Sequence, residues 1–93
     1  FTVEKSCRLL REPLAGTSPL FECAVGNHNL ITRDRNCEGL TPLGPVGWIS
    51  DAPRPGLIPL FRCSASGSAD HFVSPDSHCE GGISEGLLGY ALP

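Results

Sequence analysis

The sequence predicts an all-β fold: a small, disulfide-braced domain of two pseudo-symmetric repeats of short antiparallel strands. Apolar residues come in bursts of two to four, 11 Gly and 9 Pro separate the bursts, and five Cys lie in a chain of 93 residues. Such bursts between turn residues are typical of short strands, and the Gly and Pro positions leave no uninterrupted helical window. A core this small usually needs covalent staples, which the cysteines supply.

The chain also repeats itself. PLFEC at 19–23 returns as PLFRC at 59–63, and CEGLTPLGPVGW at 37–48 returns, with the same spacing of Gly and aromatic residues, as CEGGISEGLLGY at 79–90. A unit of about 40 residues cannot bury its apolar face alone, so we expect the two units to pack together with pseudo-twofold symmetry. The chain is therefore predicted to be one domain, 1–93, with a lead-in strand at 1–18, repeat one at 19–58 and repeat two at 59–93.

Each apolar burst is assigned to one strand, in chain order 8–10, 20–23, 30–32, 46–50, 60–63, 72–74 and 88–92. The first resembles the last strand of an earlier, missing unit, because Pro13 and Gly16 behind it return as Pro53 and Gly56. Gly-x-x-Gly before an aromatic residue suits a tight bend at which another backbone approaches closely. The Gly of each Cys-Glu-Gly stands where a positive φ is often needed.

Four of the five cysteines occupy matching places in the two repeats. Pairing within the repeats, Cys23 with Cys37 and Cys63 with Cys79, respects the symmetry and closes loops of about 15 residues, each worth roughly 3 kcal/mol in the chain-entropy model. Pairing across the repeats stays open, since four cysteines allow three connectivities. Cys7 is left over, and it predicts a disulfide-linked homodimer, a bond to a partner chain, or a buried inert thiol.

Cysteine density in so short a chain favours an oxidising compartment, so we expect a secreted, extracellular protein. C-x-x-C is absent, which disfavours zinc, and no metal or other cofactor is expected. With 7 basic and 10 acidic residues the net charge is −3, which offers no basic face for nucleic acid. No apolar stretch approaches about 18 residues, so no membrane span is expected, and Phe1 is taken as a processed or engineered N-terminus.

The second repeat, IPLFRC…SADHFVSPDSHCEG…EGLLGY, resembles a repeat of unknown function found in secreted bacterial and fungal proteins, whose pattern reads P-L-Y-R, D-H-F-x-[ST] and E-G-x-x-G-Y. The matching residues are Pro59, Leu60, Arg62, Asp70, His71, Phe72, Ser74, Glu85, Gly86, Gly89 and Tyr90. Phe61 stands where Tyr is usual. The first repeat departs further: His28-Asn29 replaces Asp-His, Leu43-Gly44 replaces Glu-Gly and Trp48 replaces Tyr. Such repeats often lie beside hydrolase or peptidase domains, and the resemblance implies binding of carbohydrate or cell-wall material.

Trp48 and Tyr90, the only Trp and Tyr, occupy the same place in the two repeats. Sugar recognition uses an aromatic face against the apolar side of a pyranose ring, with polar side chains bonding the hydroxyl groups, so these two are the candidate ligand-binding residues. Their expected polar neighbours are His28, Asn29, Asp70 and His71. Aromatic residues at the start of a strand also serve as core packing, which is the competing interpretation.

No catalytic residues are assigned, and the chain is not expected to be an enzyme. Asp70 beside His71 suits base chemistry or ligand hydrogen bonding, but it equally suits a hairpin cap beside a half-buried imidazole, and no third group completes a catalytic set. Asp76, His78 and Glu80 alternate along one short segment, so they would share a face of an extended chain. That spacing suits a divalent cation, and plain solvent exposure explains it as well.

These features together predict a secreted, non-catalytic, lectin-like binding module for carbohydrate or a cell-wall surface. Two alternatives stay open. A protease inhibitor or toxin-type subunit would present an arginine from DAPRPG at 51–56 or from ITRDRN at 31–36. A structural or assembly unit of an extracellular protein would use Cys7 for linkage.

Overall fold

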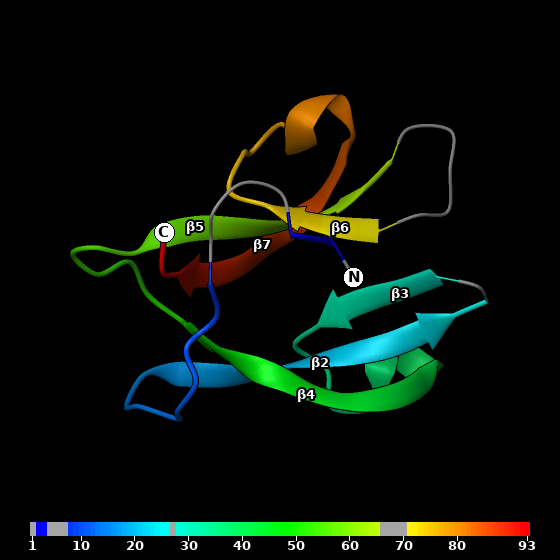
Figure 1. The fold of residues 1–93 in the computed structure, drawn as a ribbon, viewed down its shortest axis with the longest axis horizontal. Helices are drawn as coiled ribbons and strands as arrows, with labels where there is room; N and C mark the ends of the chain where they lie inside the picture. The colour runs from blue at the N-terminus through cyan, green and yellow to red at the C-terminus, as the bar shows by residue number, and fades with distance from the viewer. Residues whose placement is uncertain (1, 4–7, 27, 66–70) are drawn as a thin grey trace.

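The computed structural model describes residues 2–3, 8–26, 28–65 and 71–93, so the predictions about Cys7 and Asp70 lie outside the described residues. The fold is all-β, as predicted, and the described residues form seven strands in one curled sheet and two short 3-10 helices, η1 and η2 (Figure 1). The elements in chain order are β1 (Thr2–Val3), β2 (Thr17–Val25), β3 (His28–Thr32), η1 (Cys37–Gly39), β4 (Thr41–Ser50), β5 (Ile58–Ser64), β6 (His71–Ser74), η2 (Cys79–Gly81) and β7 (Ile83–Ala91).

The sheet order is β1-β6-β5-β7-β4-β2-β3, and it divides into a first half (β2, β3, β4) and a second half (β5, β6, β7) that meet at β4 and β7. In each half the first strand pairs antiparallel with the short strand that follows it and, along its other edge, with the last strand. The two halves form the lower and upper parts of Figure 1, and β3 contacts β6 across the space between them. The sheet therefore curls around a core that both halves share.

Corresponding residues of the two repeats have corresponding strand partners. Leu20 pairs with Gly47 and Leu60 pairs with Gly89, and β2 and β5 are each bulged at two matching places. The backbone angles agree as well, with φ of 154° at Gly47 and 157° at Gly89. The sequence repeat is thus matched by a repeat of local backbone geometry, while the pseudo-twofold arrangement of the two units stays a prediction.

The described residues form two buried clusters. The larger, the core cluster, has members from both halves, namely Leu20, Ile31, Ile49, Leu60, Val73, Leu88 and Ala91. The smaller consists of Cys23, Leu30 and Cys37 of the first half. Leu9 of the lead-in segment packs against the core cluster. Burying such side chains stabilises the fold by about 25 cal/mol per Å² of apolar surface removed from water. Since each half supplies only part of the core cluster, the two must pack together to form it.

Both predicted disulfides are present, Cys23–Cys37 and Cys63–Cys79, with Cα–Cα distances of 5.7 and 5.6 Å. All four cysteines are fully buried. Each bond ties the long first strand of its half to the 3-10 helix that follows the second strand. Each disulfide therefore holds one loop against the sheet at the midpoint of that loop. In the first half this is the loop between β3 and β4, and in the second half the loop between β6 and β7.

The Cys-Glu-Gly turns hold more backbone strain than the sequence indicated. Gly39 and Gly81 have the expected positive φ, of 87° and 92°, but the Cys and Glu before each of them also have φ between 53° and 56°. A left-handed φ costs a residue other than glycine on the order of 1–3 kcal/mol. One aspartate supports each turn, because the carboxylates of Asp34 and Asp76 each accept two backbone N–H groups of their turn.

Several strand boundaries differ from the prediction. Strands β2, β4 and β7 begin earlier than expected, and residues 41–45, which are rich in Pro and Gly, pair with β2 where no strand was assigned. Two bulges interrupt this ladder and leave Leu43 and Val46 without a partner on β2, while Pro42, Gly44 and Pro45 are paired. The parallel pairing of β1 with β6 was also not predicted. Among the described residues no helix is long and apolar enough to cross a membrane.

The lead-in segment pairs with β4 in the same way that β4 pairs with β7. The predicted strand at 8–10 forms two isolated bridges, one between Leu10 and Trp48 and one between Arg8 and Leu92. The first corresponds to the single bridge between β4 and β7, which joins Ser50 to Tyr90, because Leu10 precedes Ser50 by the same 40 residues that separate PLFEC from PLFRC. The lead-in thus occupies the place of a third last strand, as its sequence suggested.

The second Gly of each Gly-x-x-Gly makes these contacts possible. A Cβ built at Gly47 would lie 2.9 Å from the Cβ of Leu9, and one built at Gly89 would lie 2.7 Å from the backbone oxygen of Ser50. Side-chain carbons do not come this close to other atoms, so any larger residue would push the crossing strand away. The close backbone approach predicted for this motif is confirmed at both positions.

We expect Gly89→Ala to destabilise the protein more than Gly86→Ala does. Both residues have positive φ, so alanine at either position strains the backbone by about 1–3 kcal/mol. Space around Gly86 is open, whereas Gly89 touches the crossing strand, where overpacking adds roughly 1–3 kcal/mol. Urea unfolding of the two variants measures the difference, and equal losses of unfolding free energy would contradict the close-approach account.

We expect the double substitution Cys63→Ser and Cys79→Ser to lower the free energy of unfolding by about 3 kcal/mol. The disulfide closes a loop with a sequence separation of 16, and opening it restores freedom to the unfolded chain. The measurement is urea unfolding, with Cys23→Ser and Cys37→Ser as the matched variant of the other repeat. A loss below about 1 kcal/mol for both variants would show that the cystines are not needed as staples.

Candidate functional site

Trp48 and Tyr90 lie on the outer face of the sheet. Each precedes a residue of the core cluster, Ile49 in β4 and Ala91 in β7. Val46 and Leu88 lie in bulges, so the regular alternation starts after them. From there, successive side chains point to opposite faces, and the two aromatic rings point away from the face of Ile49 and Ala91. Both are half-buried, and neither belongs to the core cluster of described residues. The structure therefore does not place Trp48 or Tyr90 in the core cluster, contrary to the competing interpretation.

Trp48 lines a groove of about 890 Å³ that the lead-in segment forms with β4 and with Leu92. We call it the Trp48 groove; residues 8–12, 14, 45–48 and 92 line it. The two backbone hydrogen bonds between Leu10 and Trp48, of 2.9 and 3.0 Å, hold the lead-in segment beside the strand. Leu14, one of the apolar residues of the lining, is 55% exposed. Tyr90 does not line this groove.

Three charged side chains also line the Trp48 groove, those of Arg8, Arg11 and Glu12. None of the three has a side-chain hydrogen bond or ion pair to another described residue. Two guanidinium groups carry ten N–H donors between them, and they lie in the same lining as an aromatic ring. This combination suits a ligand that has both oxygen acceptors and an apolar face.

Sequence reasoning missed these charged residues. The available signal was the repeat spacing, because Arg8 stands 40 residues before Trp48 and so occupies the place of the aromatic residue in the lead-in. What the sequence did not indicate is that the lead-in crosses the first half beside Trp48. That placement follows from the bridge between Leu10 and Trp48, which joins distant parts of the chain.

The predicted polar neighbours in the first repeat lie away from Trp48. Trp48 pairs with Pro19 near the start of β2, whereas Asn29 pairs with Ala24 near its end. Five residues of strand separate these partners, which is about 17 Å at ~3.4 Å per residue. His28 lies one residue further along still, and the side-chain amide of Asn29 donates to Glu22 at 3.1 Å. The structure does not bring this pair to the aromatic ring.

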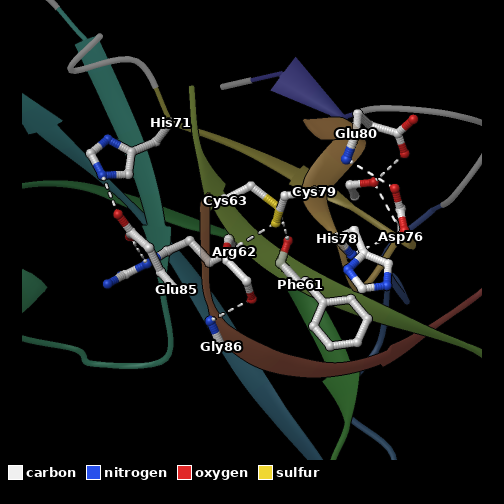
Figure 2. Close-up of a disulfide and its surroundings, with 12 residues drawn as sticks. Phe61, Arg62, Cys63, His71, Asp76, His78, Cys79, Glu80, Glu85 and Gly86 are labelled. Carbon is white, nitrogen blue, oxygen red and sulfur yellow. Dashed lines mark hydrogen bonds and ion pairs between the residues drawn. A yellow bond between two sulfur atoms is a disulfide. The ribbon is translucent and has the colours of Figure 1, made fainter. Parts of the chain in front are cut away.

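In the second repeat His71 contacts Glu85 and lies far from Tyr90. Its Nε2 is 3.3 Å from Oε2 of Glu85, while Tyr90 pairs with the opposite end of β5. The same carboxylate accepts Nε of Arg62 at 2.9 Å, so the imidazole of His71 and the guanidinium of Arg62 converge on it (Figure 2). Nδ1 of His71 is buried and has no hydrogen-bond partner among the described atoms. Among the described residues, the carboxylate beside this imidazole comes from β7.

Arg62 joins the two halves of the molecule. Its Nη1 lies 2.6 Å from Oε2 of Glu38 and 3.3 Å from the backbone oxygen of Ile31, both in the first repeat, while its Nε binds Glu85. The hydrogen bond from Arg62, followed by one from Thr32, lowers the pKa of Glu38 below its ordinary value. The same hydrogen bond raises the pKa of Arg62. This cluster links the halves at a point distant from the Trp48 groove along the strands.

Asp76, His78 and Glu80 serve the turn at η2. The carboxylate of Asp76 accepts the backbone N–H groups of His78 and Glu80 at 3.0 and 2.9 Å, and Glu80 accepts the hydroxyl of Ser74 at 2.8 Å (Figure 2). In the part of the chain that the structure describes, no three His, Cys, Asp or Glu side chains are grouped to hold a metal ion. The alternation of polar residues thus has a structural cause.

Two of the three arginines in the segments considered for protease inhibition have partners within the protein, whereas the third, Arg35, is exposed and has none among the described residues. Nη2 of Arg33 lies 2.6 Å from Asp51, and its Nη1 donates to the backbone oxygen of Leu88 at 2.8 Å. Arg54 donates to the backbone oxygen of Ala15 at 2.7 Å. An inhibitory arginine must extend from the surface into the specificity pocket of a protease. Both residues would have to break these contacts first.

Comparison of the chain with protein-family models, with curated protein sequences and with solved structures finds no match. The resemblance of the second repeat to the secreted repeat of unknown function therefore stays a prediction.

We expect Glu38→Gln to make stability less dependent on acid pH. Folding lowers the pKa of Glu38 below its ordinary value of 4.5, so its ionised carboxylate stabilises the fold above that pH. The contribution is lost as the pH falls through the lower, folded-state pKa. Because the side chain is 40% exposed, the contribution is at most about 1 kcal/mol.

Urea unfolding of wild type and Glu38→Gln across the acid range measures this effect. The two proteins should differ near neutral pH and converge at the acid end. Glu12→Gln is the matched control, because that carboxylate has no partner among the described residues and should leave the pH profile unchanged. A wild-type advantage that stays constant over the whole range would contradict the assignment to Glu38.

Proposed function

We propose that this chain is a secreted, non-catalytic binding module that recognises carbohydrate or a cell-wall surface through the Trp48 groove. The observation that carries the proposal is the position of Trp48, on the outer face of β4, in a groove whose charged side chains have no partner among the described residues. Arg8, Arg11 and Glu12 are all exposed to solvent. Here they lie around an aromatic ring, where a ligand can meet both.

The chemistry of the groove matches that of a sugar. The apolar face of a pyranose ring stacks on an aromatic side chain, and its hydroxyl groups accept hydrogen bonds from guanidinium donors and donate them to a carboxylate. Arg8, Arg11 and Glu12 supply both kinds of group. The groove volume of about 890 Å³ also lies within the range of small-molecule sites.

The disulfides support an extracellular setting for this binding. Two buried cystines in a domain of 93 residues are typical of proteins that fold in an oxidising compartment. Polysaccharides and glycans are abundant outside the cell, so the compartment and the proposed ligand agree.

The protease-inhibitor alternative has less support at Arg33 and Arg54, because both are engaged within the protein, while Arg35 is exposed and has no described partner. Stoichiometric inhibition of a trypsin-like protease that disappears in Arg54→Ala would favour it nonetheless. The assembly alternative depends on Cys7, which lies outside the described residues. A band at twice the monomer mass on a non-reducing gel would favour assembly.

We expect Trp48→Ala to abolish retention on the polysaccharide or cell wall that the wild-type protein binds, with a loss of at least about tenfold in affinity, or roughly 1.4 kcal/mol. Affinity gel electrophoresis and pull-down with insoluble polysaccharides measure this loss. Tyr90→Ala is the matched control, since Tyr90 occupies the same repeat position outside the groove. Urea unfolding of both variants verifies that each is folded.

Two outcomes would count against the proposal. If the wild-type protein is retained on no glycan, polysaccharide or cell-wall preparation, the proposed function is wrong. Retention that is lost in Tyr90→Ala but kept in Trp48→Ala would move the binding site away from the Trp48 groove.

A further inference from the structure

The described arginines fall into two groups. Arg33, Arg54 and Arg62 each donate to carboxylate or backbone oxygens of the protein. Arg8, Arg11 and Arg35 have no side-chain partner among the described residues, and of these three Arg8 and Arg11 line the Trp48 groove. The groove therefore holds two exposed cations that have no described partner in the protein, and both are available to a ligand.

The charge of the groove is opposite to that of the chain. The chain has a net charge of −3, whereas the groove lining has two arginines against the single carboxylate of Glu12. An acidic protein repels anions at long range, but beyond about 8–10 Å this repulsion is largely screened at physiological salt. At contact distance the local guanidinium groups decide which ligand is favoured, and they favour an anion.

We propose that the Trp48 groove binds an acidic polysaccharide, one whose sugar rings carry carboxylate groups, as uronic acids do. This inference rests on the proposed function and names its ligand class. The planar guanidinium of Arg8 or Arg11 binds a carboxylate through two parallel N–H···O bonds, which a neutral hydroxyl cannot reproduce. The ring of Trp48 packs against the apolar face of the same sugar or of its neighbour, so charge and stacking act on one chain of sugars.

The single tryptophan makes the test direct. Because Trp48 is the only Trp of the chain, a change in its fluorescence on titration reports on the groove itself. The probes are oligogalacturonate, alginate and hyaluronan fragments, with the methyl ester of oligogalacturonate as the neutral counterpart of the same sugar. We expect at least one of the acids to bind tenfold or more tightly than the methyl ester, and its affinity to fall as salt is added.

Arg8→Gln and Arg11→Gln should each weaken binding of that acid about tenfold, in line with the loss of a charge-assisted hydrogen bond to a ligand. Both variants should lose less affinity for the neutral ester than for the acid, because the amide of Gln still donates to hydroxyl groups but carries no charge. Arg35→Gln is the matched control, because Arg35 is exposed, has no described partner and lies outside the groove. It removes the same net charge from the chain, so it separates a local contact from a general effect of charge.

The outcomes distinguish this inference from the proposed function. Equal affinity for the acids and the neutral ester would overturn the inference and leave a neutral-sugar module. A preference for the acid that survives in the double variant Arg8→Gln and Arg11→Gln would also overturn it, because the selectivity would then come from elsewhere. Absence of binding to any acidic or neutral carbohydrate, soluble or insoluble, would contradict both this inference and the proposed function.

Discussion

The close crossing of strands at Gly47 and Gly89 is the constraint on which the rest of this structure depends. At each position another part of the backbone lies where a side chain would be, so the crossing exists only with glycine. The bridges Leu10–Trp48 and Ser50–Tyr90 form beside these residues, and they join the lead-in segment to β4 and β4 to β7. The connection between the two halves through β4 and β7 has a single paired position, so the shared apolar cluster and Arg62 supplement it.

The same crossing builds the candidate site. Because Gly47 admits Leu9 and Leu10, the lead-in segment passes directly beside Trp48 and turns one face of an exposed strand into a groove. Leu9 turns inward to the core cluster, while Arg8 and Arg11 line the groove. Stability and the proposed binding site therefore depend on one contact, and a substitution at Gly47 would affect both together.

Two sets of charged side chains differ in their surroundings, since one lies in a cluster between the repeats and one in the Trp48 groove beside the crossing. Glu38, Arg62 and Glu85 form a connected cluster between the repeats, in which each charge offsets another and the pKa of Glu38 is lowered as a result. Exposed ion pairs of this kind contribute modestly to stability, so the cluster chiefly fixes which strands lie together. Arg8 and Arg11 belong to no such cluster among the described residues, and for that reason the groove is where we infer recognition of an anionic ligand.

The sequence by itself determined what short-range patterns control. Apolar bursts between Gly and Pro predicted the strands, the matched cysteines predicted both disulfides, and Gly39 and Gly81 showed the positive φ that Cys-Glu-Gly suggested. Only the tertiary structure decided which distant residues meet: it placed Glu85 beside His71, separated Asn29 from Trp48 along β2, and brought Arg8 and Arg11 to the groove. The physical reason is that a local pattern restricts the torsion angles of each residue and the face of the strand to which its side chain points. Contacts between segments follow from register and crossing, which many weak interactions set together.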